Sequence, residues 1–353
     1  MRWISLFILS LLLPACENAP TEAEVVQRTE RMAQLRAQQY ICENNQLNGL
    51  QRAKACIAAA SIEKADHLDL GDLELKALPP QLFELGDHLT HLELWGNHLI
   101  DVPEDVVKLK HLTHLNLSRN QFQILPLSIF QLPELKTLNL NQNEILIVEA
   151  IEGKVKLPAL STLEHLFLNE NRLDRFPLLF CRMTAIKGIH LSENNIAYLP
   201  EELGQLKTLT DLRLDHNKLD QLPKGIGKLA ALRTLRVGNN QLAELPASMK
   251  SLTSLKILGL SSNPFTRFPS VVTALTGLEE FEYAIPNQRS NRLPDELSKL
   301  TVLRELKIHL KKTTELPDVV FGLTNLQALF IENGAELAAG QREQLVARNI
   351  KVY

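Results

Sequence analysis

The sequence has few aromatic residues, few cysteines and almost no excess of charge. Aromatic side chains make up 5% of the 353 residues, so a core must be built mainly from aliphatic side chains. Four cysteines are too few for a small domain held together by disulfides. A formal net charge of -3 excludes a broadly basic nucleic-acid-binding protein. The 45% of hydrophobic and 22% of charged residues indicate a folded chain.

Signatures of the common enzyme classes are also missing. The sequence contains no G-x-S-x-G, no phosphate-binding P-loop, no H-E-x-x-H and no kinase signature. The segment after residue 331 is short, so we expect no appended catalytic domain. We therefore expect a protein that is not an enzyme and that uses no cofactor.

The N-terminus has the pattern of an export signal. Arg2 precedes an apolar run over residues 4–13, which is too short to span a bilayer as a mature helix. The following Leu-Pro-Ala-Cys, ending at Cys16, resembles the lipobox of bacterial lipoproteins. The resemblance implies a signal peptide over residues 1–15, lipid attachment at Cys16 and a place in the cell envelope, at the outer membrane in a Gram-negative organism. An ordinary secretory signal with an incidental cysteine is the alternative.

Asparagine recurs at a nearly constant interval through the chain. Successive steps are 23 residues, except for one step of 28. A fixed period of this size is typical of a solenoid, in which each repeat packs only against its neighbours. The recurring residues are Asn97, Asn120, Asn143, Asn171, Asn194, Asn217, Asn240 and Asn263.

Leucine and proline recur in phase with these asparagines. The pattern L-x-x-L-x-L-x-x-N-x-L-x-x-L-P resembles the leucine-rich repeat, and its 23-residue length is similar to that of Ras-associated scaffold proteins and plant intracellular homologues. The resemblance covers residues 65–331 and implies an α/β solenoid of about twelve units. We expect a horseshoe or arc with a parallel concave sheet, and an asparagine ladder that pairs backbone groups in the turns.

Both ends of the repeat array are expected to carry caps. Residues 16–64 are expected to form a tether and a helical N-terminal cap, and residues 332–353 a C-terminal cap. Cys42 and Cys56 lie 14 residues apart in the first cap, and a disulfide between them suits an exported protein. Two free buried cysteines are the alternative. Insertions at 149–154 and 285–289 break the period and are expected to form loops.

The outward-facing strand residues should form one continuous concave surface. In leucine-rich repeat proteins generally, that face binds other proteins, and a rigid surface loses little entropy on binding. Aromatic and arginine residues are the commonest anchors of protein interfaces. The residues that we expect to contact a partner are Glu93, Trp95, Phe167, His190, Arg213 and Arg236. Solvated strand residues without a role are the alternative at each position.

Histidines gather in the first units. Seven of the ten lie between residues 67 and 165. Neighbouring strands would bring His91 and His114 to within about 5 Å of each other. Such a pair, with carboxylates nearby, could hold zinc or copper or could make binding depend on pH. Histidines copied with the repeat and lacking any role are the third interpretation.

These observations predict a non-enzymatic, membrane-anchored interaction protein. Its concave face would bind a protein partner, its N-terminal lipid would insert into the membrane, and nucleic acid would not be a ligand. The alternative is an adhesion lipoprotein that binds glycan or cell wall by stacking sugars on Trp95 and Phe167. A minor alternative is a metal-binding protein centred on the histidines.

Overall fold

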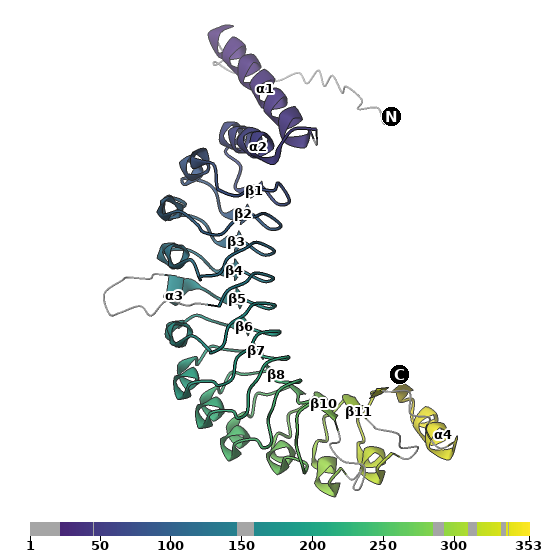
Figure 1. The fold of residues 1–353 in the computed structure, drawn as a ribbon. Coiled ribbons are helices and arrows are strands. Elements are labelled where there is room, and N and C mark those ends of the chain that lie inside the picture. Colours follow the sequence, from purple (N-terminus) through teal and green to yellow (C-terminus); the bar gives the residue numbers. More distant parts are fainter. Residues whose placement is uncertain are drawn as a thin grey trace, which may run out of the picture.

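The computed structural model describes residues 22–44, 46–146, 159–284, 293–309, 316–332, 337 and 339–353. Cys16 and the segment that resembles a signal peptide lie outside the described residues, as do both insertions. The described chain follows an arc (Figure 1), with helices α1 and α2 at one end and α4 at the other. The predicted solenoid of leucine-rich repeat architecture with an N-terminal helical cap is confirmed.

Thirteen short strands pair in parallel, in chain order, into one sheet. The central residue of each three-residue strand is leucine, or Ile189 in β6; it lies in register with the next, as in Leu92, Leu115 and Leu138, and points into the core. The residues on either side of it point outward, because successive side chains of a strand alternate between faces. The strands are β1 His67–Asp69, β2 His91–Glu93, β3 His114–Asn116, β4 Thr137–Asn139, β5 His165–Phe167, β6 Gly188–His190, β7 Asp211–Arg213, β8 Thr234–Arg236, β9 Ile257–Gly259, β10 Glu280–Ala284, β11 Glu305–His309, β12 Ala328–Glu332 and β13 Lys351–Val352.

Short 3₁₀ helices run along the side of the arc away from the strands (Figure 1). All ten begin directly after a proline, whose ring fixes φ and which needs no hydrogen-bond partner for a backbone N–H. They are η1 Pro80–Leu85, η2 Glu104–Lys108, η3 Leu127–Gln131, η4 Leu178–Arg182, η5 Glu201–Gln205, η6 Lys224–Lys228, η7 Ala247–Ser251, η8 Ser270–Ala274, η9 Asp295–Lys299 and η10 Asp318–Gly322. A single helical turn, α3 Ala159–Thr162, occupies this side between η3 and η4.

The buried asparagines form a ladder through the turns that follow the strands. Asn217 donates from Nδ2 to the carbonyl oxygens of Leu214 (3.0 Å) and of Leu191 in the preceding unit (2.9 Å). Its Oδ1 accepts the backbone N–H of Ile196 at 2.9 Å. The other seven ladder asparagines repeat this arrangement. Each amide therefore satisfies polar backbone groups that have no access to water.

The residue before each ladder asparagine adopts a left-handed backbone. Only Gly96 among these residues is a glycine, with φ +68°. The others carry side chains, which disfavour this conformation, and they are held in it by the ladder on one side and the strand on the other. They are Arg119, Gln142, Glu170, Glu193, His216, Asn239 and Ser262.

Two helices close the N-terminal end of the sheet. Helix α2 (Gly49–Glu63) begins after Asn48, whose side chain accepts the Gln51 N–H, and it buries Ala53, Cys56 and Ile57. Helix α1 (Glu22–Glu43) packs on α2 and exposes most of its own surface. A disulfide joins Cys42 to Cys56 with their Cα atoms 5.0 Å apart, so α1 is fixed to the helix that covers the first unit.

The C-terminal end is closed by helix α4 (Ala339–Ala347) and strand β13. Leu345 of α4 is fully buried, and the Tyr353 backbone continues the pairing of β13 with β12. Cys181 is a free, buried thiol, and burial together with the Glu202 charge raises its pKa to about 11. No helix in the described part of the chain combines the length and apolar character needed to cross a bilayer.

Candidate functional site

The concave face of the sheet is built from rows of side chains one repeat apart. The first and third residues of each strand point outward, and parallel pairing places equivalent residues of successive units side by side. The face is therefore a fixed array whose spacing is set by backbone hydrogen bonds and not by loops.

A row of histidines occupies the first position of strands β1 to β3. The rings of His91 and His114 are stacked, with 4.2 Å between centroids and 8° between planes. His67 adds a tilted ring, 5.9 Å from that of His91. Thr137 ends the row on β4, and His165 of β5 lies instead over Gly188 of β6. The sequence analysis placed His91 and His114 together, and the structure does so.

Threonine hydroxyls decide which imidazole nitrogen carries the hydrogen. Thr90 Oγ1 donates its single hydrogen to the Asp66 carbonyl at 3.0 Å and lies 2.8 Å from His91 Nδ1. Both contacts are satisfied at once when His91 Nδ1 carries the ring hydrogen and donates to the hydroxyl. Thr113 makes the same pair of contacts, to the Thr90 carbonyl and to His114 Nδ1. In both neutral rings Nε2 is therefore the unprotonated nitrogen.

The stacked rings are not oriented like the ligands of a tetrahedral metal ion. Parallel rings present their Nε2 atoms side by side, whereas the ligands of a tetrahedral zinc converge on one point. In the ranges that the structure describes, no group of three or more His, Cys, Asp or Glu residues is placed to hold a metal. Burial, then the charges of His91, Lys136 and His165, lowers the pKa of His114, which favours its neutral form.

Carboxylates and an indole border the histidine row. Asp69 accepts the Gly71 backbone N–H at 2.8 Å, and Glu93 accepts the Asn116 side-chain amide at 2.6 Å. The Trp95 indole packs directly on Gly71, where a Cβ atom would come within 2.4 Å of the ring. The Arg119 guanidinium lies 5.9 Å from the Trp95 ring centroid. Trp95 is thus partly buried between neighbouring units and does not stand free.

At the centre of the face, Phe167 contacts His190, and both His190 and Arg213 contact Asp211. The Phe167 and His190 rings meet edge to face, with centroids 4.8 Å apart. His190 Nε2 lies 3.2 Å from Asp211 Oδ2, and Arg213 donates to the same oxygen at 3.1 Å. Burial disfavours the Asp211 carboxylate, but these hydrogen bonds and charges outweigh it and lower its pKa. Three of the expected partner-binding residues are therefore brought together.

Arg236 belongs to a separate ion-pair network on β8, β10 and β11. It crosses over Gly259 of β9 and reaches Glu280 at 2.8 Å and Glu282 at 3.3 Å. Lys307 shares Glu280 at 2.7 Å. Arg213 and Arg236 are thus both paired within the chain. The sequence analysis missed these pairings, because residues 44 positions apart meet only across an intervening strand.

A second ladder, which the sequence analysis also missed, runs beside the first. Asn141 Oδ1 accepts the Asn169 N–H at 2.7 Å, and Asn169 Oδ1 accepts the Ser192 N–H at 2.8 Å. Asp215 Oδ1 accepts the Gly238 N–H at 2.9 Å in the same way, and burial raises the pKa of this carboxyl. The signal was present as an Asn or Asp two positions before a ladder asparagine. These residues stiffen the edge of the concave face.

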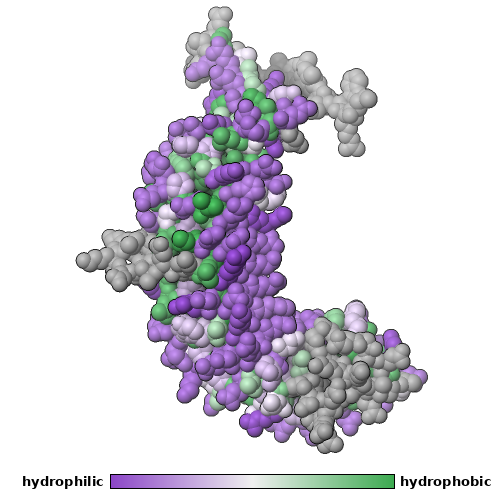
Figure 2. Space-filling model, viewed as in Figure 1, coloured by the Kyte–Doolittle hydropathy of each residue, from purple (hydrophilic) through white to green (hydrophobic). Residues whose placement is uncertain are grey.

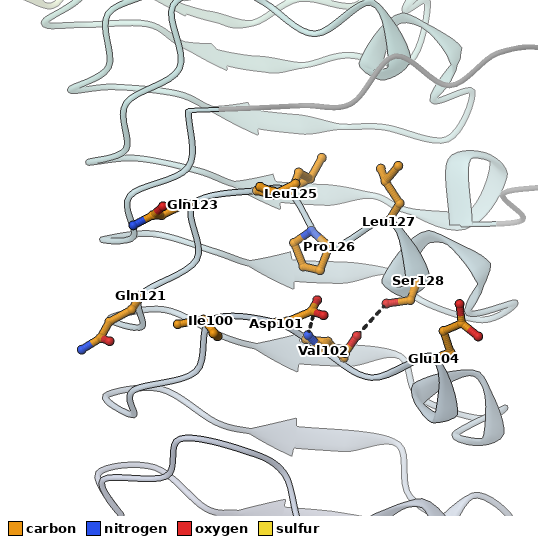
Figure 3. A pocket seen from close by; sticks show the side chains of 11 residues that line it. Ile100, Asp101, Val102, Glu104, Gln121, Gln123, Leu125, Pro126, Leu127 and Ser128 are labelled. Atoms are coloured by element: carbon orange, nitrogen blue, oxygen red, sulfur yellow. Dashed lines mark hydrogen bonds between the residues drawn. The ribbon is translucent and has the colours of Figure 1, made fainter.

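A groove lies on the flank of the second and third units, away from the concave face. It encloses about 560 Å³, and Figure 3 shows the Ser128 hydroxyl and the Asp101 carboxylate bonded to the Val102 backbone at its floor. Exposed apolar residues gather on this flank of the arc (Figure 2). Two exposed apolar residues, Ile100 and Ile124, line the groove itself. No sequence motif pointed to this groove.

Comparison with known proteins supports the repeat assignment. A family model described as a leucine-rich repeat region matches residues 172–341, and a second leucine-rich repeat model matches residues 64–122 and 87–145. No curated protein sequence matches the chain. The chain is a leucine-rich repeat protein.

Three bacterial structures share this fold. A leucine-rich repeat protein of Leptospira interrogans is 24% identical with a TM-score of 0.58, and the match covers 84% of this chain and 98% of that one. The functional domain of InlJ from Listeria monocytogenes, which includes a cysteine ladder, is 21% identical with a TM-score of 0.61, over 83% and 58% of the two chains. An internalin, inlF, of Listeria monocytogenes is 19% identical with a TM-score of 0.59, over 85% and 92%. At these identities the likeness concerns the fold.

Proposed function

We propose that this protein is a lipid-anchored, non-enzymatic binding protein of the cell envelope whose concave face holds a protein partner. The observation that carries the proposal is the uninterrupted parallel sheet, whose outward rows are held in place by backbone pairing and two side-chain ladders. Such a preorganised surface can contact a partner through several rows at once with little loss of conformational entropy. Leucine-rich repeat proteins such as internalins are typically interaction proteins, which agrees with this function.

Membrane anchoring is supported by the sequence around Cys16, which resembles a lipobox. Attached there, the chain would present its N-terminal helical cap nearest to the bilayer and extend the arc away from it. Outer-membrane delivery in a Gram-negative organism remains part of the proposal.

The glycan-binding alternative is less well supported. Sugar rings stack on open aromatic faces, whereas the Trp95 ring is covered by Gly71 on one side and has Arg119 near it. Phe167 is engaged by the edge of His190. Retention of the purified protein on peptidoglycan or lipopolysaccharide, with no other protein present, would favour this alternative over a protein partner.

Photo-cross-linking in intact cells tests the concave-face proposal. A benzoylphenylalanine residue at Asn139, which points outward from β4, should capture a protein partner, whereas the same residue at Lys224 on η6 serves as the control. Capture from Lys224 and not from Asn139 would mean that the partner contacts the other side of the arc.

Once a partner is captured, alanine substitutions locate its anchors. We expect at least one of Trp95→Ala, Phe167→Ala, Arg213→Ala and Arg236→Ala to weaken binding about thirtyfold, as truncation of an anchor that contributes about 2 kcal/mol does. Lys224→Ala and Lys250→Ala should bind like the wild type. If all four concave variants bind normally and a change within 149–157 abolishes binding, the concave face is not the site.

A further inference from the structure

The first units of the sheet carry rows of imidazoles and carboxylates side by side. We propose that this surface, which we call the His–carboxylate surface (His67, His91, His114, Asp69 and Glu93), binds a lysine- and arginine-bearing segment of the protein partner. The inference rests on the proposed binding function and adds the chemistry of the partner to it.

The pairing of charges differs along the concave face. Toward the C-terminal end, carboxylates have cations within the chain: Asp211 has Arg213, and Glu280 has both Arg236 and Lys307. Among the residues that the structure describes, Asp69 and Glu93 form no ion pair, and their hydrogen-bond donors are an uncharged backbone N–H and an uncharged amide. Their negative charges are thus left for a partner of opposite sign.

The imidazoles of this surface present hydrogen-bond acceptors. Thr90 and Thr113 hold the ring hydrogens of His91 and His114 on Nδ1, so each Nε2 offers a lone pair. Lysine and arginine side chains carry only donors, three and five respectively, and match both the imidazole and the carboxylate row. The two rows sit on opposite ends of the same three-residue strands, so one extended segment crossing β1 to β3 would meet both.

Binding of a cationic segment to this surface should depend on pH with a defined sign. Protonation of the imidazoles would place positive charge beside the cationic segment and weaken binding. Protonating both stacked rings also places like charges 4.2 Å apart, so the neutral pair is favoured near neutral pH. Affinity should therefore fall as the pH falls through the titration range of histidine. The charged and titratable groups around the His91–His114 pair come from five successive units. The first unit contributes Asp66, His67 and Asp69, and the second contributes Glu93. The next three units contribute Arg119, Lys136 and His165, in that order.

Fluorescence anisotropy with a defined probe tests the proposal. The probe is a fluorescein-labelled peptide of alternating arginine and serine, and its counterpart has glutamate in place of arginine. At constant, low ionic strength the wild-type protein should bind the arginine peptide near pH 7.5 and bind it about tenfold more weakly near pH 5.5, a difference of about 1.4 kcal/mol. Equal binding of the glutamate peptide would overturn the proposal.

Matched variants assign the binding to this surface. Asp69→Asn with Glu93→Gln should weaken arginine-peptide binding about tenfold or more at pH 7.5. Asp101→Asn with Glu104→Gln makes the same change of net charge beside the flank groove and should have little effect. If both double variants weaken binding equally, the peptide senses only net charge, and the proposed surface is wrong.

The histidine pair has its own test. His91→Gln with His114→Gln should preserve binding at pH 7.5 and remove most of the loss at pH 5.5. Retention of the full pH dependence would exclude the pair as its source, and circular dichroism melting of each variant shows whether the fold is intact. A partner captured from Asn139 that ignores the Asp69 and Glu93 changes would leave the concave-face function standing and overturn only the cationic partner.

Discussion

The guanidinium of Arg236 spans a complete strand to reach Glu280, with 2.8 Å between Arg236 Nη2 and Glu280 Oε1. Gly259 stands between them, and its missing side chain leaves the path open. The two side chains are only 24% and 17% exposed, so the pair is screened less than an ion pair at the open surface.

Glu280→Gln should therefore lower the free energy of unfolding by about 1 to 2 kcal/mol, between the effects of breaking exposed and fully buried pairs. Burial disfavours the Glu280 carboxylate, but Lys307 and Arg236 outweigh it and lower its pKa from the ordinary 4.5. Its stabilisation is thus complete above about pH 4.5 and is lost as the pH falls through the lower, folded-state value. Urea unfolding of wild type and variant between about pH 3 and pH 7 measures this. The variant should show a smaller loss in acid, and the neighbouring Glu279→Gln, which breaks an exposed pair with Lys256, should change stability less.

Asn217→Ala should destabilise the chain by about 1 to 3 kcal/mol, because it leaves the Ile196 N–H without a partner inside the turn and removes one of the two amide donors to each of the Leu191 and Leu214 carbonyls. Asn325→Ala, which removes one hydrogen bond from an exposed side chain, is the control. Chemical unfolding followed by circular dichroism gives both values. Similar costs at the two positions would mean that the ladder amides contribute no more than a surface hydrogen bond.

Glu193 tests the left-handed residues, since its side chain is exposed and its φ is 58°. Glu193→Val should destabilise by about 1 to 2 kcal/mol, because a β-branched side chain is strained in this conformation. Glu193→Gly should be close to neutral, since relief of strain offsets the greater freedom of glycine in the unfolded chain. Thermal melting of both variants decides the matter, and a valine variant as stable as the glycine variant would contradict the strain.

Thiol labelling of the unreduced, denatured protein should modify Cys181 and leave Cys42 and Cys56 unlabelled. Mass spectrometry of the labelled peptides is the measurement. Loss of the disulfide in a Cys42→Ser, Cys56→Ser variant should cost about 3 kcal/mol, on the chain-entropy estimate for a loop of this size. Labelling of all three cysteines would show that the helical cap is held by packing alone.

Cys16→Ser should release the protein from the membrane fraction and abolish incorporation of labelled palmitate. The wild-type chain, fractionated in parallel, is the control. A variant that stays in the membrane, together with a wild type that takes up no palmitate, would remove the lipid anchor from the proposed function.

Much of the fold could be predicted from the sequence, because each unit repeats the same consensus sequence. The leucines at 212 and 214, the asparagine at 217 and the proline at 223 define strand, turn and 3₁₀ helix within 12 residues, and the neighbouring copy confirms them. The His91–His114 contact followed in the same way, since equivalent residues of adjacent units must be neighbours.

Some contacts could not be predicted from the sequence, because they depend on side chains that differ from those at the equivalent positions of other units. Arg236 extends across the adjacent strand because the residue there, Gly259, has no side chain. Trp95 packs on Gly71 for the same reason. The flank groove arises where Ile100 and Ile124 stand in positions that carry polar residues in later units, such as Asp220 and Glu244. Each of these follows from a pair of residues and not from the repeat, so the consensus pattern carried no sign of them.

The two ends of the sheet differ in how they would respond to force. The first strand is covered by α2, which a covalent bond joins to α1, whereas the last strand has only two residues. Each strand of a solenoid is held mainly by its immediate neighbours, so strands can detach one at a time from an end. A force applied between the C-terminal units and an N-terminal tether would first detach β13 from β12. The disulfide-linked helices would be the last elements to unfold. The arc would then lengthen in steps under load while its N-terminal units kept their shape.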